Sequence, residues 1–387
     1  MSWEMVEISK VANVITGTTP SKSNNEFYEG GDIPFVTPRE LGANHPIHKA
    51  TTYLTDKGFL KANVVPKFSI LVCCIGSIGK MGIAGREIAT NQQINSVVFD
   101  SSLVDYRYGY RALSNVKSTM INSASSTTIA ILNKSNFERI KIPLPPLPEQ
   151  QRIANILDKA EAINQKRAQV LVLCDEFLRA TFLDMFGHHF SSKGYPSSTK
   201  KSIALLTDYI DYRGKTPKKT EYGIPLITAK NVRKGYVDEE PREFISEDLY
   251  DDWMTRGLPL KNDVLFTTEA PLGNVALLGE YEKVAVGQRL VSLRCKEEVT
   301  PIYFMYALLD RYTQQLIFQR SSGSTVKGIR TKELYQIEIP TPPIELQQKF
   351  SSIVEKVNAI KARIQHAQEL PLFEALSQQA FKGELTL

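Results

Sequence analysis

The sequence predicts an α+β fold in which two tandem mixed α/β domains are separated by two long helices that form an antiparallel coiled coil. Three observations support this prediction. An internal repeat spans about half the chain, each copy changes from strand-like to helical periodicity at a proline-rich segment, and a heptad-like apolar stripe follows each such segment. The repeat also predicts a pseudo-twofold plan. A chain of 387 residues is long enough to build two domains with buried cores.

The internal repeat is clearest around the two proline-rich segments. The segment that begins at Ser125 aligns without a gap with the segment that begins at Ser322, 197 positions later. Both contain the pattern Pro-x-Pro-Pro followed by Gln-Gln. Upstream, the turn Gly17-Thr18-Thr19-Pro20 corresponds to Gly214-Lys215-Thr216-Pro217. A unit this long is typical of a duplicated domain and not of a solenoid.

Each repeat unit changes character once along its length. Before the prolines, short β-branched and apolar runs alternate with Gly, Pro and Asn turns, which is typical of strands in a mixed domain. We also expect helices near 106–121 and 304–318. After the prolines the apolar period becomes helical. The expected domain bounds are 1–146 and 191–342 for the two globular domains, 147–190 for the first long helix, and 343–387 for the second long helix and C-terminal tail.

Apolar residues recur at matching heptad-like steps in both helical segments. Such a stripe predicts that each helix packs along a partner helix. The alternative is an ordinary core helix that packs on its own domain. Pro371 interrupts the second segment and predicts a kink or break there. The expected positions for helix pairing and partner docking are Ile153, Ile156, Ala160, Ile163, Val170, Phe350, Ile353, Val357, Ile360 and Ile364.

Motifs for catalysis, cofactors and metals are missing from the sequence. Residues 74–81 match a phosphate-binding loop in part, but Cys74 replaces its first glycine and Met81 replaces the magnesium-binding Ser or Thr. The five histidines and four cysteines show no spacing typical of a metal site. We therefore expect a protein without catalytic residues, without a cofactor and without a metal.

Several features predict a cytoplasmic protein that does not associate with a membrane. The first seven residues contain two glutamates and no apolar region of a secretory signal. The longest apolar run, 70–75, is far shorter than the roughly 20 residues that a membrane-spanning helix needs. The cysteines form no CxxC pair, which fits a reducing compartment.

The distribution of charge is more informative than its sum. The net charge of +5 permits a nucleic-acid partner without requiring one. Residues 213–234 hold seven Lys and Arg against one acid, Glu221, whereas residues 238–252 hold eight acids against Arg242 alone. This separation predicts a polarised surface whose basic side can face phosphates. A solvated charged face is the alternative.

The whole plan resembles the specificity subunit of a Type I restriction-modification system. The resemblance covers essentially the entire chain and rests on two divergent domains, each closed by PLPPLPEQQRI or PTPPIELQQKF and a long helix. The GTTP and GKTP turns, the segments that begin at Ile33 and Ile224, and residues 381–385 also look like that family. In the second copy Glu345-Leu346 replaces Pro148-Glu149, which is a small departure.

The resemblance implies that each globular domain is a target recognition domain that reads one half of a split double-stranded DNA sequence. The paired helices would set the spacer and dock two methyltransferase subunits, and motor-nuclease subunits would join the larger complex. Lysines and arginines would hold phosphates, while amides and arginines would read base edges. The alternatives are the specificity subunit of a related DNA-modification defence system, a coiled-coil scaffold without DNA binding, and a stand-alone enzyme acting on nucleic acid. The candidate DNA-binding residues are Lys22, Arg39, Lys80, Asn91, Gln92, Gln93, Arg213, Lys215, Lys218, Lys219, Lys230, Asn231, Arg233, Gln288, Arg289 and Lys327.

Overall fold

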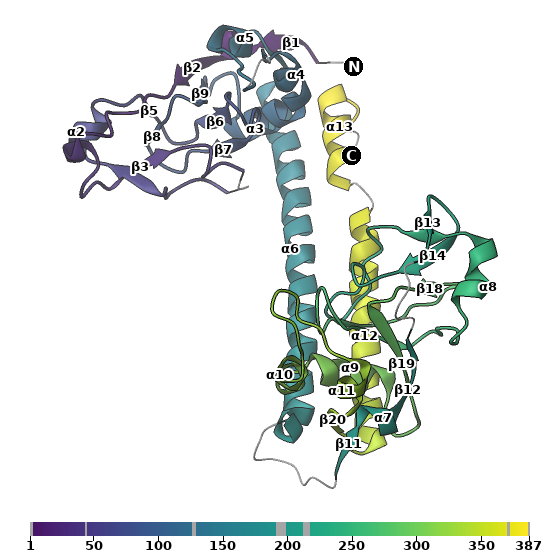
Figure 1. Cartoon of the computed structure of the whole chain (residues 1–387). Helices are drawn as coiled ribbons and strands as arrows, with labels where there is room; N and C mark the ends of the chain where they lie inside the picture. The colour runs from purple at the N-terminus through teal and green to yellow at the C-terminus, as the bar shows by residue number, and fades with distance from the viewer. Residues whose placement is uncertain are drawn as a thin grey trace. The chain divides into compact units, whose positions relative to one another are not determined.

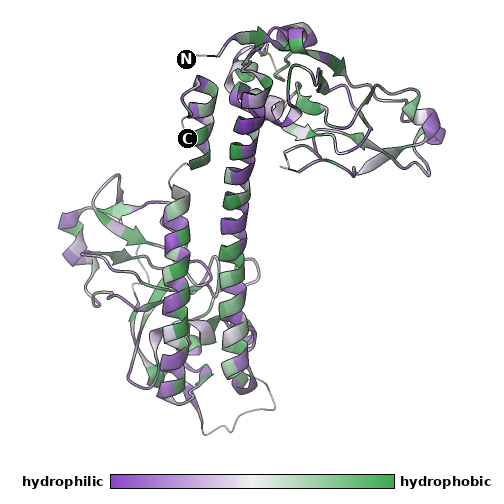
Figure 2. Ribbon diagram, turned by 180° about the vertical axis from the view of Figure 1, so that it is seen from behind, coloured by the Kyte–Doolittle hydropathy of each residue, from purple (hydrophilic) through white to green (hydrophobic). Residues whose placement is uncertain are grey.

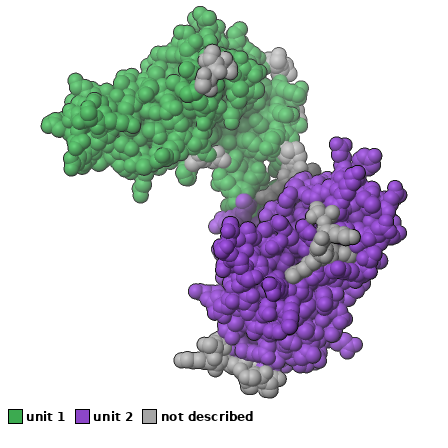
Figure 3. All heavy atoms as spheres, in the orientation of Figure 1, with its two compact units in different colours: residues 1–167, 368–387 green, residues 168–367 purple. Residues whose placement is uncertain are grey.

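The chain forms two compact units, which the computed structural model describes over residues 3–42, 45–125, 129–190, 199–211, 217–369 and 372–385. Unit 1 consists of residues 1–167 and 368–387, and unit 2 of residues 168–367 (Figures 1 and 3). The long helix α6 (Leu147–Phe186) begins in unit 1 and ends in unit 2. Each unit combines sheets with helices, which confirms the predicted α+β fold class.

Within its described residues, unit 1 holds three sheets. The first is antiparallel throughout, in the order β2-β9-β6-β7, and the second runs β4-β3-β8-β5 with β3 and β8 parallel. A two-stranded sheet pairs β1 with β10 beside the start of α6. The strand bounds are β1 (Met5–Glu7), β2 (Ala12–Thr16), β3 (Ile33–Val36), β4 (Thr52–Leu54), β5 (Val64–Val65), β6 (Ile70–Cys73), β7 (Met81–Ile83), β8 (Ile88–Thr90), β9 (Ile94–Phe99) and β10 (Lys141–Pro143).

Unit 2 repeats this plan, which confirms the internal repeat. Its antiparallel sheet runs β12-β19-β16-β17, its mixed sheet β13-β15-β14-β18 with β14 and β18 parallel, and its two-stranded sheet pairs β11 with β20. The mixed sheets differ at their edges, because unit 1 adds β5 beside β8 whereas unit 2 adds β13 beside β15. The strand bounds are β11 (Lys200–Ser202), β12 (Thr207–Asp211), β13 (Lys219–Thr220), β14 (Ile224–Ile227), β15 (Phe244–Ile245), β16 (Val264–Thr267), β17 (Val275–Leu277), β18 (Ala285–Val286), β19 (Leu290–Cys295) and β20 (Glu338–Pro340).

The helices repeat between the units as well. The pairs α3 with α4 and α9 with α10 lie in the two regions where the sequence predicts helices. The helix bounds are α1 (Ile8–Val11), η1 (Asn25–Phe27), α2 (Asp56–Phe59), α3 (Tyr106–Asn115), α4 (Lys117–Asn122), α5 (Lys134–Glu138), η2 (Gly187–Phe190), α7 (Ile203–Leu206), η4 (Glu247–Leu249), α8 (Tyr250–Trp253), α9 (Pro301–Leu309), α10 (Arg311–Gln319), α11 (Thr331–Tyr335), α12 (Ile344–Glu369) and α13 (Leu372–Lys382). None of the described helices is both long and apolar enough to cross a lipid bilayer.

The first glutamine of each Gln-Gln pair joins a long helix to its globular domain. Gln150 is fully buried, and its side chain donates to the carbonyls of Leu103 and Pro145, both at 2.9 Å, and accepts from the amide of Asp105 at 3.0 Å. Gln347 makes the same three bonds, to the carbonyls of Glu298 and Pro342 at 3.1 and 2.8 Å and from the amide of Thr300 at 2.9 Å. The repeated sequence motif is therefore a repeated hydrogen-bonded junction, and buried polar groups of this kind need such partners.

The two long helical segments pair antiparallel within unit 2. Phe182 and Phe186, late in α6, lie with ring centroids 5.5 and 5.6 Å from Phe350, which is early in α12. Asp175, earlier in α6, forms an ion pair with Lys361, later in α12, with 2.6 Å between Oδ1 and Nζ. Figure 2 shows hydrophobic and hydrophilic residues alternating along both helices. This confirms the predicted pairing within unit 2.

The last described helix, α13, packs on α3 within unit 1, and the residues that follow it contact the start of α6. The ring of Phe381 lies 5.7 Å from that of Tyr108 in α3, and Arg152, early in α6, donates to the carbonyl of Leu385 at 2.9 Å. Each core is therefore closed both by the helix that follows its own domain and by a helix end contributed from the other half of the sequence. Pro371, where we expect a kink or break, lies outside the described residues.

Candidate nucleic-acid interface

In each domain, three segments far apart in sequence meet beside the antiparallel sheet. In unit 2 the amide of Thr268 donates to the carbonyl of Arg289 at 3.0 Å, and the amide of Ile329 donates to the carbonyl of Thr268 at 3.0 Å. In unit 1 the amide of Cys74 donates to the carbonyl of Gln93 at 2.8 Å, and the amide of Leu132 to that of Cys74 at 2.8 Å. Isolated bridges extend the match, pairing Glu269 with Gly328 and Ile75 with Ile131. Arg289 and Gln93 are therefore structurally equivalent.

Gln288 and Arg289 lie between two hollows in the surface of unit 2. The larger hollow, of about 450 Å³, is lined in part by Glu269, Arg330 and these two residues. The smaller, of about 130 Å³, shares Gln288 and Arg289 and adds Lys230 among its lining residues. Arg289 is half exposed, and its Nε lies 3.0 Å from Oε1 of Glu269. A partly exposed guanidinium and amide between two concave surfaces can contact the edges of DNA bases.

A carboxylate holds two of the predicted lysines at the smaller hollow. Oε1 of Glu243 lies 2.7 Å from Nζ of Lys219 and 3.2 Å from Nζ of Lys230. Burial alone would raise the pKa of Glu243, but hydrogen bonds and charge from the two lysines outweigh it and lower that pKa below 4.5. The carboxylate therefore stays ionised and fixes both ammonium groups at one edge of the domain. Lys218 is exposed beside them.

Asn231 is buried and its amide is hydrogen-bonded inside the domain, whereas a residue that reads a base needs an exposed amide. It is 2% exposed, its Oδ1 accepts from the amide and hydroxyl of Thr228, both at 3.0 Å, and its Nδ2 donates to the carbonyls of Asp238 and Pro241 at 3.1 and 3.0 Å. These bonds use the amide to shape the loop after β14. Arg233 pairs with Asp238 nearby at 3.3 Å.

Glu40 holds the loop after β3 in unit 1, as Asn231 holds the loop after β14 in unit 2. Its two carboxylate oxygens accept hydrogen bonds from the hydroxyls of Thr37 and Thr51 at 2.8 and 2.7 Å, and also from their backbone amides. Burial would raise the pKa of Glu40, yet these hydrogen bonds lower it below 4.5 overall. The loop after β3 is thus held by a carboxylate where unit 2 uses a buried amide.

The amide cluster predicted in unit 1 forms, and the GTTP turn covers it. Asn91 is buried and donates to Oε1 of Gln93 at 2.9 Å, whereas Gln92 is exposed and accepts from the hydroxyl of Thr19. Gly17 lies so close to this segment that a Cβ there would meet the carbonyl oxygen of Asn91 at 2.2 Å. Only glycine fits this approach, which explains the first residue of the motif.

The remaining candidates divide into exposed and supporting positions. Lys80 is partly buried and donates to the carbonyl of Pro38 at 2.7 Å, so it braces the loop that carries Arg39. Arg213 and Lys215 lie outside the described residues. Residues that the sequence did not single out are Thr19, Glu243, Glu269 and Arg330. The exposed candidates are Lys22, Arg39, Gln92, Lys218, Lys219, Lys230, Arg289 and Lys327.

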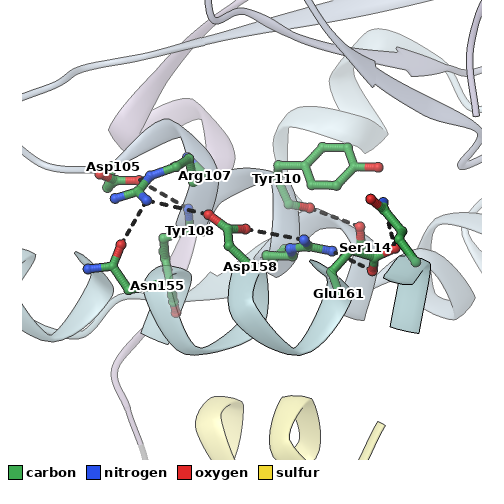
Figure 4. A network of polar contacts seen from close by, with 10 residues as sticks. Asp105, Arg107, Tyr108, Tyr110, Ser114, Asn155, Asp158 and Glu161 are labelled. Atoms are coloured by element: carbon green, nitrogen blue, oxygen red, sulfur yellow. Dashed lines mark hydrogen bonds and ion pairs between the residues drawn. The ribbon is translucent and has the colours of Figure 1, made fainter. Parts of the chain in front are cut away.

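A polar network fixes the first domain on α6 within unit 1 (Figure 4). Arg107 donates to Asn155 at 2.8 Å and lies 3.4 Å from Asp158, and Arg111 lies 3.2 Å from the same carboxylate and 3.6 Å from Glu161. In unit 2 an aromatic contact joins α9 to α12, because Tyr306 and Phe350 meet at 5.0 Å between ring centroids. The two domains are thus joined to their long helices in part by different chemistry.

The heptad-like residues are buried near the domains and exposed further along the helices. Ile153, Ala160, Phe350 and Val357 are buried, and Ile156, Ile353 and Ile364 are partly buried. Ile163, Val170 and Ile360 are 44%, 38% and 49% exposed. The burial of Ile153 and Phe350 includes contacts with their own domains, as the alternative interpretation expects. Partner docking at the exposed positions stays a prediction.

Comparisons with known proteins agree with this architecture. The Type I restriction modification DNA specificity domain matches residues 1–172 and 206–370. The chain is 24% identical over 375 residues to the Type I restriction enzyme MjaIX specificity subunit of Methanocaldococcus jannaschii, covering 91% of this chain and 86% of that protein. It is 32% identical over 176 residues to the Type I restriction enzyme HindI specificity subunit of Haemophilus influenzae, covering 43% of this chain and 38% of that protein.

A solved structure has the same fold over the full length. The crystal structure of the Type-I restriction-modification system S subunit from M. genitalium superposes with a TM-score of 0.59 at 18% identity, covering 100% of this chain and 97% of that one. The family match extends over both copies of the repeat, each with its sheets, its buried glutamine junction and its long helix. The chain therefore belongs to the Type I restriction modification DNA specificity domain family.

Proposed function

We propose that this chain is the DNA sequence-recognition subunit of a Type I restriction-modification complex and that each globular domain reads one half of a bipartite duplex target. The observation that carries the proposal is the equivalence of the two domains around Gln93 and Arg289. Two similar readers on one chain fit a target with two specified parts. The recognition domains are residues 1–146 and 191–342, the first spacer helix lies in residues 147–190, and residues 343–387 hold the second spacer helix and the C-terminal tail.

Phosphate contacts and base contacts divide among the candidates according to their exposure. Exposed lysines and Arg39 would contact the phosphates of the DNA backbone and set the register of each domain. Such phosphate contacts position the protein but carry no sequence information. Gln92, Gln93, Gln288 and Arg289 would read base edges in the major groove. Asn91, Asn231, Arg233 and Lys80 would support these residues by shaping the neighbouring loops, since these four are buried or partly buried and their side-chain nitrogens already donate within the domain.

The partners proposed for the helices are two methyltransferase subunits. The exposed apolar residues Ile163, Val170 and Ile360 would form part of their docking surface, because exposed apolar side chains on a helix stabilise contact with a partner. Motor-nuclease subunits would join the larger complex. This chain would itself be non-catalytic and would act in the cytoplasm. Among the described residues, no group of three or more His, Cys, Asp or Glu side chains is arranged to hold a metal ion.

Methylation profiling tests the proposed function. The full chain is coexpressed with methyltransferase subunits of the same restriction-modification system, and the methylated sites of the host DNA are mapped at single-base resolution. We expect two short specified sequences separated by a fixed number of unspecified base pairs, and no methylation when the chain is supplied without its partners. A single uninterrupted target, or methylation by the chain alone, would contradict the proposal.

A further inference from the structure

Equivalent positions in the two domains carry different chemistry. The carbonyls of Gln93 and Arg289 accept equivalent backbone hydrogen bonds, and each residue comes directly after a glutamine and directly before an inner strand of its antiparallel sheet, β9 or β19. Their side chains therefore start from the same place in the fold. One ends in a neutral amide and the other in a guanidinium, so the two domains cannot read the same base with the same hydrogen-bond pattern.

Arg289 is held at one nitrogen and open at the other two. Its Nε lies 3.0 Å from Oε1 of Glu269, while its terminal nitrogens donate no hydrogen bond to the described part of the chain. Gly328 lies against Glu269, since a Cβ on that glycine would lie 3.3 Å from the Cβ of Glu269 and 3.5 Å from its Oε2. An ion pair that is 50% and 44% exposed adds little to folding stability. Its effect is to limit the rotamers of Arg289 before a ligand binds.

The surroundings of Arg289 favour an anionic ligand with a planar recognition edge. The hollow of about 450 Å³ is lined by two cations, Arg289 and Arg330, and by one acid, Glu269. A third cation, Lys327, lies in the sequence between two further lining residues, Val326 and Gly328. At the four equivalent positions unit 1 has Gln93, Asn133, Ala130 and Ile75, which carry no charge.

We infer that Arg289, oriented by Glu269, reads a guanine in the half-site bound by the second domain. The two open terminal nitrogens match the O6 and N7 acceptors that guanine presents in the major groove. Lys327 and Arg330 would hold the flanking phosphates. The amide of Gln93 instead matches the N6 and N7 groups of adenine, so the two half-sites differ in the base read at the equivalent step. The inference rests on the proposed function.

The test compares the targets of the wild-type complex with those of Arg289→Gln, Arg289→Lys and Glu269→Gln, each assembled with its methyltransferase subunits. Methylation profiling identifies the required bases, and DNA binding is measured with every base substituted at each position. Arg289→Lys keeps the charge but loses the planar fork. We expect both Arg289 variants to lose about tenfold to a hundredfold of the discrimination for guanine at one position of one half-site. Glu269→Gln should weaken that discrimination less, because Glu269 acts by positioning Arg289.

A matched control is Lys261→Gln, which removes one exposed cation of unit 2 from a pair with Glu280 at 2.6 Å. It should leave every target position unchanged. Equal weakening of Arg289→Gln for all sequences would mean a phosphate contact and would overturn the inference, as would Arg289→Lys with unchanged guanine discrimination. A wild-type target whose second half-site needs no guanine overturns the inference and leaves the proposed function standing. A wild-type complex without a bipartite target overturns both.

Discussion

The junction around Gln347 offers a direct test of how the long helix is attached to its domain. Replacing Gln347 by alanine removes three hydrogen bonds, to the carbonyls of Glu298 and Pro342 and from the amide of Thr300. The side chain is fully buried, so water cannot readily replace the lost partner. Two acceptors and one donor are left without their bonds.

The expected loss is about 3 kcal/mol, at about 1 kcal/mol for each hydrogen bond. For a unit of this size, 1 kcal/mol corresponds to about 2–4 °C in Tm, so the transition of unit 2 should fall by about 6–12 °C. The neighbouring residue of the same motif, Gln348, is exposed and provides the matched control. Gln348→Ala should change the free energy of unfolding by less than about 0.5 kcal/mol.

Calorimetry and urea unfolding of the full chain measure both variants. We expect a large loss of stability for Gln347→Ala and almost none for Gln348→Ala. Equal effects of the two substitutions would refute this expectation, because they would show that the buried junction contributes no more than a solvated glutamine. Gln150→Ala and Gln151→Ala form the same pair in unit 1, where Gln150 is buried and Gln151 is exposed.

Three other predictions follow from packing, charge and helix length. Phe350→Ala should cost about 3–5 kcal/mol in urea unfolding, because Phe350 is fully buried, whereas a loss no greater than that of exposed Lys349→Ala would contradict the packing. Folding lowers the pKa of Glu40, so the contribution of its ionised carboxylate to stability is present above pH 4.5 and is lost as the pH falls through the folded pKa. The free energy of unfolding of Glu40→Gln should therefore differ from that of the wild type at pH 7 and converge with it in acid. A difference that stays constant with pH would refute this. Inserting one heptad into both long helices adds about 10 Å to each, or about three base pairs, and should lengthen the spacer found by methylation profiling without changing either half-site, so an unchanged spacer would disprove the spacer role.

Features repeated in the sequence were the most predictable. The offset of 197 residues, the strand-to-helix change and the heptad steps predicted two similar units and an antiparallel helix pair, because duplication and periodicity leave their mark in the order of residues. The function of the Gln-Gln pair was not predictable in the same way. Gln150 reaches carbonyls and an amide that only the folded loop around Leu103 brings near it.

The candidate interface was predictable by residue type and much less by role. Asn231 and Gln288 are both amides in basic surroundings, yet Asn231 is buried with its bonds made inside the loop, whereas Gln288 lines both hollows. Glu269 gave no signal, because its pairing with Arg289 joins residues twenty positions apart through a sheet register. The sequence pattern alone contains no information on which polar groups the fold has already satisfied.

A domain exchange tests the central claim most directly. Residues 1–146 are replaced by the corresponding domain of a family member with a different target, and the methylated sites of the assembled complex are mapped. If each domain reads its own half of the target, one half-site changes to that of the donor, while the other half-site stays the same. A change in both half-sites, or in neither, would contradict the account.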